Sequence, residues 1–332
     1  MHFGIFLKTA MMRGVISVVY LHSLLMKNSP FYPVYWPSWL ALALLRLWVA
    51  LPYSWIFYSG KGLGWLMDKA LKGRRHVVEV NIGLCFPELS DSQQDALVSK
   101  TMQSTALGLL ETAYSWWASD AAIKKRSHVE GLEHIDKANQ EGRGVLLIGA
   151  HYTTLDLSGR VLGSERLIDV VYRPQGNKAF DYIINRSRTK HLGELIEKID
   201  MRKMIKRLKR GHTVWYASDQ DLGPRGSVFV PFFGIPTATI TTIRQLVKLS
   251  GAKVLFYAHY RIDDGGNSRY VGKVLDVFDE KLGTEDIENA RQVNQVIEDS
   301  IRPHPEQYLW VHRRFKTRPN EDDPDFYAKF RK

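Results

Sequence analysis

Two patterns of hydrophobic and polar positions divide the chain. The run Trp39–Tyr58 is almost continuously apolar, with Arg46 as its one charged residue. Further along, apolar residues recur at helical spacing or form short blocks bounded by glycine, without internal repeats. We therefore expect residues 1–75 to form a membrane-anchoring region and residues 76–332 to form one α/β domain.

The second region is expected to alternate helices with short strands. Its predicted helices are Asp91–Trp117, Thr154–Leu162, Thr241–Ser250 and Thr284–Ile301. Its predicted strands are Gly144–Gly149, Asp169–Tyr172, Thr213–Ala217, Val254–Ile262 and Tyr270–Phe278. The last two strands flank Asp263–Gly266, whose Asp-Asp-Gly-Gly sequence favours a hairpin turn. Together these elements predict an α/β fold with a mixed β-sheet flanked by helices.

The N-terminal apolar run is long enough to cross a bilayer as a transmembrane helix or to lie along its surface. Its Trp and Tyr residues are typical of membrane interfaces, whereas Arg46 and Pro52 argue against a single straight span. A tilted span, a re-entrant pair of helices and a buried core helix of a soluble protein stay open. The first 27 residues resemble a signal peptide, but Lys8 and Arg13 interrupt the apolar run, so we expect this segment to stay attached.

Composition and charge narrow the class of protein. A hydrophobic content of 45% in 332 residues excludes intrinsic disorder, and the single cysteine, Cys85, excludes a disulfide framework and a cysteine metal cluster. The net charge is +11, yet residues 1–75 carry nine Lys and Arg against Asp68 alone and so hold +8 of it. A basic segment that is also apolar favours a membrane surface over nucleic acid. The larger positive cluster follows the apolar run, which favours a cytoplasmic main domain.

The most informative motif for chemistry is His151-Tyr-Thr-Thr-Leu-Asp156. His151 falls in the turn after the predicted strand that ends at Gly149, and Asp156 falls in the first turn of the next helix. A carboxylate that accepts a hydrogen bond from one imidazole nitrogen leaves the other nitrogen free to act as a base. Because the sequence has no G-x-S-x-G elbow, and no phosphate-binding glycine motif after a strand, the pair suits direct attack of a substrate hydroxyl on a thioester. A structural histidine beside a helix-capping aspartate is the alternative.

A cationic segment lies further along the chain. Arg186, Arg188 and Lys190 precede Arg202–Arg210, in which six of the nine residues are basic. On a helix, this segment presents a cationic face to phosphates, anionic lipid or an acidic protein, or else a face that is only solvated. No nucleic-acid recognition motif is visible, so nucleic acid is disfavoured as a partner.

Acidic residues follow another predicted strand. Asp219 and Asp221 come directly after Thr213–Ala217, at the strand end where ligands bind in open α/β sheets. With the apolar segment Phe229–Gly234 they are expected to line a pocket for a long chain. A capped turn beside a core cluster is the alternative.

Several of these blocks, in this order, resemble the bacterial lipid A late acyltransferases, the lauroyl and myristoyl transferases related to the glycerol-phosphate acyltransferases. The resemblance runs nearly the whole chain. It is carried by the Trp-rich segment that ends at Leu51-Pro-Tyr53, Arg74-Arg75, Asn81–Leu89, the His151/Asp156 motif, Tyr172-Arg-Pro174 with Asn177, Val214–Asp221, Phe229–Gly234 and Pro305–Pro319.

The resemblance implies a bacterial inner-membrane enzyme with a glycerol-3-phosphate acyltransferase-like fold and a catalytic domain on the cytoplasmic side. It implies transfer of a fatty acyl chain, lauroyl or myristoyl, from acyl carrier protein to a hydroxyacyl chain of a Kdo-bearing lipid A precursor, in contact with membrane lipids. It calls for no cofactor and no metal. Lauroyl-transferring members often have Glu where this chain has Asp156, so the acyl length and the acceptor position stay open.

The same resemblance assigns candidate roles by motif position. His151 becomes the general base and Asp156 its orienting partner. The candidate substrate-binding residues are Arg188, Asp219, Arg173 and Asp221. A glycerolipid acyltransferase that acts on glycerol phosphate is the rival enzyme, disfavoured by the block His312–Pro319. A non-catalytic membrane lipid-binding protein is the rival of another class, disfavoured by the intact His/Asp motif.

Overall fold

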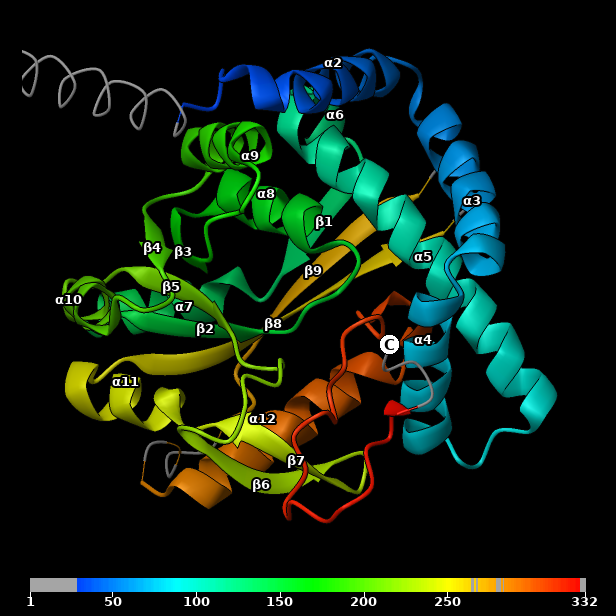
Figure 1. Cartoon of the computed structure of the whole chain (residues 1–332). Coiled ribbons are helices and arrows are strands. Elements are labelled where there is room, and N and C mark those ends of the chain that lie inside the picture. Colours follow the sequence, from blue (N-terminus) through cyan, green and yellow to red (C-terminus); the bar gives the residue numbers. More distant parts are fainter. Residues whose placement is uncertain (1–28, 264–265, 267, 279–281, 283, 329–332) are drawn as a thin grey trace, which may run out of the picture.

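The centre of the molecule is a seven-stranded mixed β-sheet, seen in a computed structural model that describes residues 29–263, 266, 268–278, 282 and 284–328 (Figure 1). The strand order is β1-β9-β8-β2-β5-β3-β4. Neighbouring strands run parallel except for the antiparallel pair β8 and β9. The strands are β1 (Ser127–Glu130), β2 (Val145–Gly149), β3 (Ile168–Tyr172), β4 (Leu195–Glu197), β5 (Thr213–Ala217), β8 (Lys253–Ile262) and β9 (Arg269–Leu275). The predicted mixed sheet is confirmed.

Helices cover both faces of this sheet. Because successive strand residues point to opposite faces, Leu146 and Ile148 of β2 pack into one core cluster and Val145 and Leu147 into another. The first cluster includes residues of α4 (Lys72–Cys85), α10 (Met201–Lys209), α11 (Thr242–Ser250) and α12 (Asp286–Ile301). The second includes residues of α7 (Leu132–Gln140) and α8 (Leu155–Glu165). Shorter or peripheral elements are η1 (Pro33–Tyr35), α6 (Asp120–Lys124), α9 (Lys178–His191), η2 (Pro305–Gln307) and the hairpin of β6 (Ser227–Phe232) and β7 (Ile235–Ile240).

Several predicted elements have the bounds that the sequence pattern indicates. The long helix α5 spans Asp91–Trp117, and its start carries a capping box between Ser90 and Gln93. Strand β5 spans Thr213–Ala217. Gly251 ends α11 with a φ of 69°, a left-handed conformation that glycine adopts without strain. The predicted β8–β9 hairpin is also confirmed, although most of its turn lies outside the described residues.

The N-terminal apolar run forms two helices instead of one. Helix α2 (Trp36–Val49) ends before Pro52, and α3 (Tyr53–Ala70) begins directly after it. Pro52 lacks a backbone N–H and cannot continue the hydrogen-bond ladder of α2. Among the described residues, no helix is long and apolar enough to cross a membrane. The run Trp39–Tyr58 is thus divided between two helices and is not one continuous helix. The signal-peptide-like segment 1–27 lies outside the described residues.

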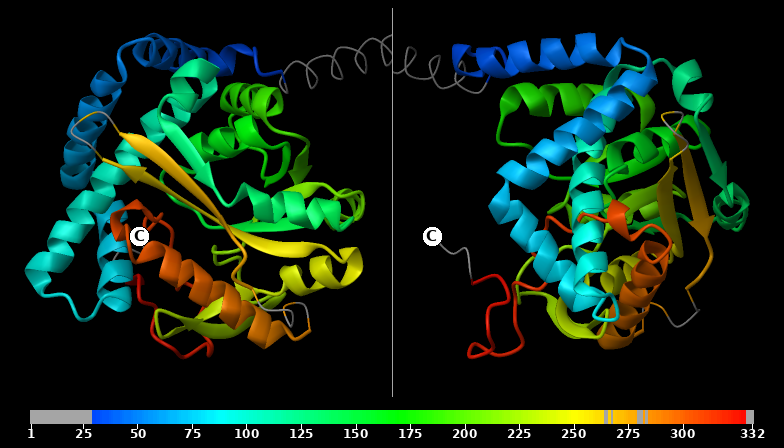
Figure 2. Two further views of the ribbon diagram at one scale, coloured as in Figure 1. Left: turned by 180° about the vertical axis from the view of Figure 1, so that it is seen from behind. Right: turned by 90° about the vertical axis from the view of Figure 1, so that its right-hand side faces the viewer.

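Helix α3 lies against α5 in both views of Figure 2. Ile56 and Phe57 of α3 are fully buried beside Leu107 of α5. Gly60 and Gly64 allow this close approach, because a Cβ on Gly64 would lie 2.4 Å from the backbone of α5. The expected boundary after residue 75 falls inside α4, and the division into two regions stays a prediction.

Candidate active site

The site lies where the central strands of the sheet end. His151 follows β2, and Asp219 follows its parallel neighbour β5. Because parallel strands end at the same edge of a sheet, the two side chains meet there. Nδ1 of His151 lies 2.6 Å from Oδ1 of Asp219, and the backbone N–H of His151 donates to Oδ2 at 2.8 Å. The carboxylate thus holds both the ring and the backbone of His151.

This contact corrects the expected partner of the histidine. Asp156 lies in the first turn of α8 as predicted, but its Oδ1 accepts hydrogen bonds from Arg188 on α9, at 2.7 Å from Nη2 and 3.1 Å from Nε. Sequence proximity favours Asp156, whereas the parallel pairing of β2 and β5 brings Asp219 to Nδ1. Asp219 itself was expected to bind substrate, so the residue was identified but given another role.

The charges around His151 favour its protonated form. Burial alone would lower the pKa of His151, but the charge and hydrogen bond of Asp219, together with the charge of Asp156, outweigh it and raise this pKa. Burial would likewise raise the pKa of Asp219, yet the contacts with His151 and a hydrogen bond from Tyr308 keep that pKa far below its ordinary value. Asp219 is therefore ionised, and the Nδ1 proton of His151 is held against it. Nε2 is the nitrogen left to exchange a proton with substrate.

The C-terminal segment fixes the loop that carries His151. The amide of Leu309 donates to the carbonyl of His151 at 2.9 Å, and the amide of Thr153 donates to the carbonyl of Gln307 at 2.7 Å. Both Gln307 and the ring of Tyr308 are buried. Residues distant in sequence thus set the backbone position of the base, which gives part of the block Pro305–Pro319 a structural function.

The other predicted site residues divide into two groups. Asp221 is buried, and its oxygens accept from the Thr317 hydroxyl and the amides of Thr317 and Gly223 at 2.8 to 2.9 Å. It anchors the C-terminal segment and does not line the adjoining cavity, so we revise its expected role in substrate binding. Arg173 and Arg188 both line that cavity.

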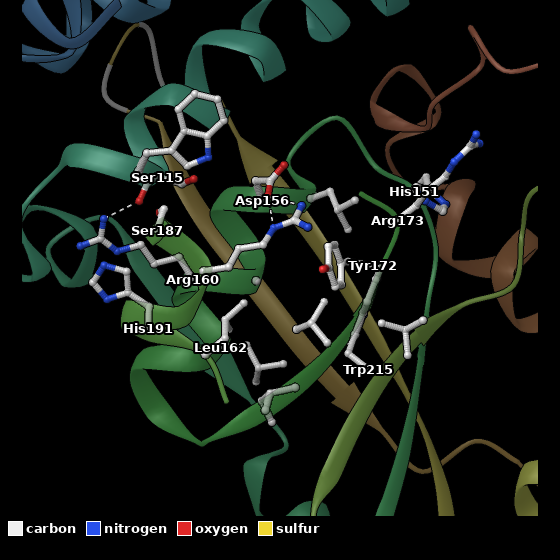
Figure 3. A pocket seen from close by; sticks show the side chains of 18 of the residues that line it. Ser115, His151, Asp156, Arg160, Leu162, Tyr172, Arg173, Ser187, His191 and Trp215 are labelled. Atoms are coloured by element: carbon white, nitrogen blue, oxygen red, sulfur yellow. Dashed lines mark hydrogen bonds and ion pairs between the residues drawn. The ribbon is translucent and has the colours of Figure 1, made fainter. Parts of the chain in front are cut away.

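The cavity beside His151 has a volume of about 520 Å³ and lies between β3, β5, α8 and α9 (Figure 3). Its apolar wall includes Leu162, Val170 and Trp215. Asp156, Arg173 and Gln220 add polar groups. Arg160 and Arg188 also line it, so the chamber combines an apolar wall with charged groups beside a reactive side chain. The apolar wall suits a hydrocarbon chain, and the polar groups can orient the rest of a substrate.

The segment Phe229–Gly234 does not contribute to this cavity, contrary to expectation. It forms most of β6 and the β6–β7 turn. The alternation of a strand turns Val230 and Phe232 into the core, where the ring of Phe232 packs on Phe315. The cavity is built by α8, α9 and the strands they cover instead.

Further histidines near the site were not predicted. His259 on β8 lines the cavity, and its Nδ1 lies 2.8 Å from the Thr154 hydroxyl. Burial lowers the pKa of His259 to about 3 and that of His312 to about 4, so both rings are neutral at physiological pH. The sequence does offer a signal for His259, because it is a polar residue inside the mostly apolar strand predicted over Val254–Ile262. No cluster of three or more metal-ligand side chains occurs within the described part of the chain.

Comparison with known proteins identifies similar sequences over most of the chain. The family described as bacterial lipid A biosynthesis acyltransferase matches residues 26–317. The lipid A biosynthesis lauroyltransferase of Escherichia coli K12 is 39% identical over 292 residues, which cover 87% of this chain and 94% of that protein. The palmitoleoyltransferase of the same organism is 36% identical over 291 residues, again 87% and 94% of the two chains. Its myristoyltransferase is 29% identical over 296 residues, which cover 88% and 91%.

Proposed function

Because the chain belongs to the bacterial lipid A biosynthesis acyltransferase family and is an acyltransferase, we propose that it moves a fatty acyl chain from acyl carrier protein to a hydroxyacyl chain of a Kdo-bearing lipid A precursor. We take lauroyl as the chain and myristoyl as the alternative. The observation that carries the mechanism is the contact between Asp219 and His151, a residue that lines the cavity.

The reaction needs one base and no covalent enzyme intermediate. Nε2 of His151 takes the proton of the acceptor hydroxyl as its oxygen attacks the thioester carbonyl. The carbon–sulfur bond then breaks, and the imidazolium returns the proton to the departing thiolate. Asp219 stabilises the imidazolium between the two steps and keeps the ring in one orientation. The products are an ester on the acceptor and the free thiol of the carrier.

The ion pair of Asp156 and Arg188 borders the same chamber. Oδ1 of Asp156 lies 2.7 Å from Nη2 of Arg188, and both side chains are about four-fifths buried. Asp156 therefore acts on His151 through its charge, and Arg188 holds that carboxylate in place. Arg173, which is exposed at the cavity wall, is available to bind an anionic or carbonyl group of substrate.

The N-terminal helices support a place at a membrane surface. Large apolar side chains of α2 and α3 project from the molecule, each more than half exposed: Trp36, Leu40, Leu44, Leu47, Trp55 and Tyr58. Such a row, with aromatic residues among aliphatic ones, is typical of helices that lie in the bilayer interface. We place the protein at the bacterial inner membrane with its catalytic domain on the cytoplasmic side.

The function is tested by mass spectrometry of reaction products. Detergent-solubilised protein is given acyl carrier proteins loaded with chains of different length, together with the tetra-acylated Kdo-bearing precursor. We expect one acyl addition, lost in His151→Ala and retained in His128→Ala, whose ring on β1 is 68% exposed. Equal product from His151→Ala would refute the assigned base. Transfer to glycerol phosphate instead of the precursor would identify the rival acyltransferase.

A further inference from the structure

A second concavity lies between the start of α4 and the C-terminal segment. This groove has a volume of about 940 Å³ and is lined by residues 70–74, Val77, Leu309, Val311–Arg313 and Lys316. Four of the lining residues are cations: Lys72, Arg74, Arg313 and Lys316. None of the lining residues is acidic, and the described part of the chain offers none of these four cations an ion pair.

Such a concentration of positive charge attracts anions. Like charges gathered in one groove repel each other, and a partner of opposite charge relieves that repulsion. The start of α4 adds to the effect, because Lys72 and Arg74 lie in its first turn, where the helix dipole is positive. That turn holds no acidic residue and no side-chain cap.

Buried hydrogen bonds hold the two walls of the groove together. Asn81, fully buried on α4, donates from its amide to the carbonyls of Trp310 and His312 at 2.6 and 2.8 Å. Its own oxygen accepts from the Tyr327 hydroxyl at 2.6 Å. The C-terminal segment is thereby held alongside α4, as Figure 1 shows. This arrangement gives a function to Asn81, which lies in one of the sequence blocks noted above.

The same segment connects the groove to the catalytic histidine. Leu309 lines the groove, and its amide is the donor to the carbonyl of His151. His312 also lines the groove, and its Nε2 accepts from the amide of Asp221, two residues beyond Asp219. One lining residue of the cationic groove, Leu309, is therefore hydrogen-bonded to His151, which itself lines the other cavity.

We propose that this groove binds the phosphate groups of the acceptor headgroup and so places the acceptor hydroxyl at His151. The identity of the acceptor rests on the proposed function. The headgroup must lie close to the base, because the hydroxyl that reacts is on a chain attached to it. The cations suit phosphate oxygens, and the apolar cavity beside Leu162 and Trp215 is left for the acyl chain of the donor.

The test uses full-length protein in neutral detergent. The variant Lys72→Gln/Lys316→Gln removes one charge from each wall. Neither lysine has a hydrogen bond or ion pair within the described residues, so none is lost. The matched control is Lys137→Gln/Lys248→Gln, which removes two exposed lysines from α7 and α11. A third variant, Lys72→Arg/Lys316→Arg, keeps the charge.

Two measurements follow on each protein. Calorimetry measures binding of the bisphosphorylated glucosamine disaccharide without acyl chains, and steady-state kinetics measures KM for acceptor and donor. In the groove variant we expect the Kd of the disaccharide and the acceptor KM each to rise about tenfold or more, with donor KM and kcat within about twofold. The control and the arginine variant should keep wild-type values.

Other results separate the sources of phosphate and the two proposals. Unchanged disaccharide binding in the groove variant would overturn the inference. The inference would also be overturned if the groove variant lost only its binding to vesicles of phosphatidylcholine and 20 mol% phosphatidylglycerol, measured by co-sedimentation. The groove would then contact bilayer phospholipid instead of the acceptor headgroup. If wild-type protein transfers no acyl chain but its disaccharide binding still depends on Lys72 and Lys316, the proposed function is refuted. The assignment of the groove as a phosphate-binding site is then still supported.

Discussion

Asp219 and Asp156 both act on the imidazole of His151, and their geometry ranks them. Asp219 contacts the ring at 2.6 Å, whereas Asp156 is bonded to Arg188. We predict that Asp219→Asn lowers kcat/KM by about 100-fold or more, the range expected for general-base catalysis. Asp156→Asn should cost less, because it removes a charge and leaves the orienting contact in place.

The pH profile distinguishes these carboxylates further. Protonation of His151 removes the base, so kcat/KM falls as pH decreases through the pKa of His151. Asp219 raises this pKa against the effect of burial. Asp219→Asn should therefore shift the acid limb of the profile to lower pH, and Asp156→Asn should shift it the same way by less. A larger shift in Asp156→Asn would contradict the orienting role of Asp219.

For single residues, the sequence identifies the base, His151, but not the carboxylate that contacts its ring. His151 stands out because it follows an apolar strand and precedes an aspartate. Which carboxylate reaches its ring depends on which strand lies beside β2, and strand order is not encoded in local spacing. The structural role of Asp221 is hidden for the same reason, because Thr317 is 96 positions away.

Helix α8 carries a glycine that leaves room in the apolar cavity. Gly159 lines the cavity, and a Cβ added there would meet no atom within 4 Å. We predict that Gly159→Leu fills this space and shifts the preferred donor towards shorter acyl chains, measured by competition among acyl carrier proteins. Stability should not fall, because Leu is favoured over Gly in a helix by about 0.5–1 kcal/mol. Gly62→Leu, at an open position of α3, should leave chain preference unchanged.

Two glycines of α3 set its distance from α5. A Cβ on Gly64 would approach the Cα of Gln103 to 2.4 Å, and this backbone atom cannot move aside as a side chain would. We predict that Gly64→Ala destabilises the protein by about 1–3 kcal/mol, the usual cost of overpacking. Gly62→Ala, on the same helix, should be neutral or slightly stabilising. Equal midpoints of urea unfolding for the two variants would argue against this packing.

Elements with strong local signals are predicted well, and those decided by tertiary contacts are not. Strand β5 and helix α5 match their predicted bounds because an apolar block or stripe ends at a polar cap. The run Trp39–Tyr58 is one apolar segment in the sequence. In the structure the chain bends at Pro52, between the end of α2 and the start of α3, and α3 packs on α5. The hydropathy pattern alone does not predict that bend.

Across the whole molecule, a buried polar cluster connects the N-terminal helices to the sheet. Glu111 of α5 is fully buried and accepts from Arg261 of β8 at 2.7 Å, from Tyr270 of β9 at 2.6 Å and from Tyr53 of α3 at 3.1 Å. Arg261 also donates to Ser104 at 2.8 Å. Residues of four elements therefore meet around the ion pair of Glu111 and Arg261. No local sequence pattern predicts this cluster, because its members are up to 217 positions apart.

This cluster predicts that the N-terminal helices and the sheet unfold together. Arg261→Met leaves the carboxylate of Glu111 buried without its cation, which should cost about 3–5 kcal/mol in urea unfolding. The double variant Glu111→Met/Arg261→Met should cost less than the sum of the single variants, because no buried charge is left. Lys61→Met is the control: Lys61 also connects α3 to the end of β8, through Asp263 at 3.0 Å, but this pair is exposed and should contribute at most about 1 kcal/mol. Equal losses for Arg261→Met and Lys61→Met would mean that burial does not strengthen the link, and the helices would then be held by apolar packing alone.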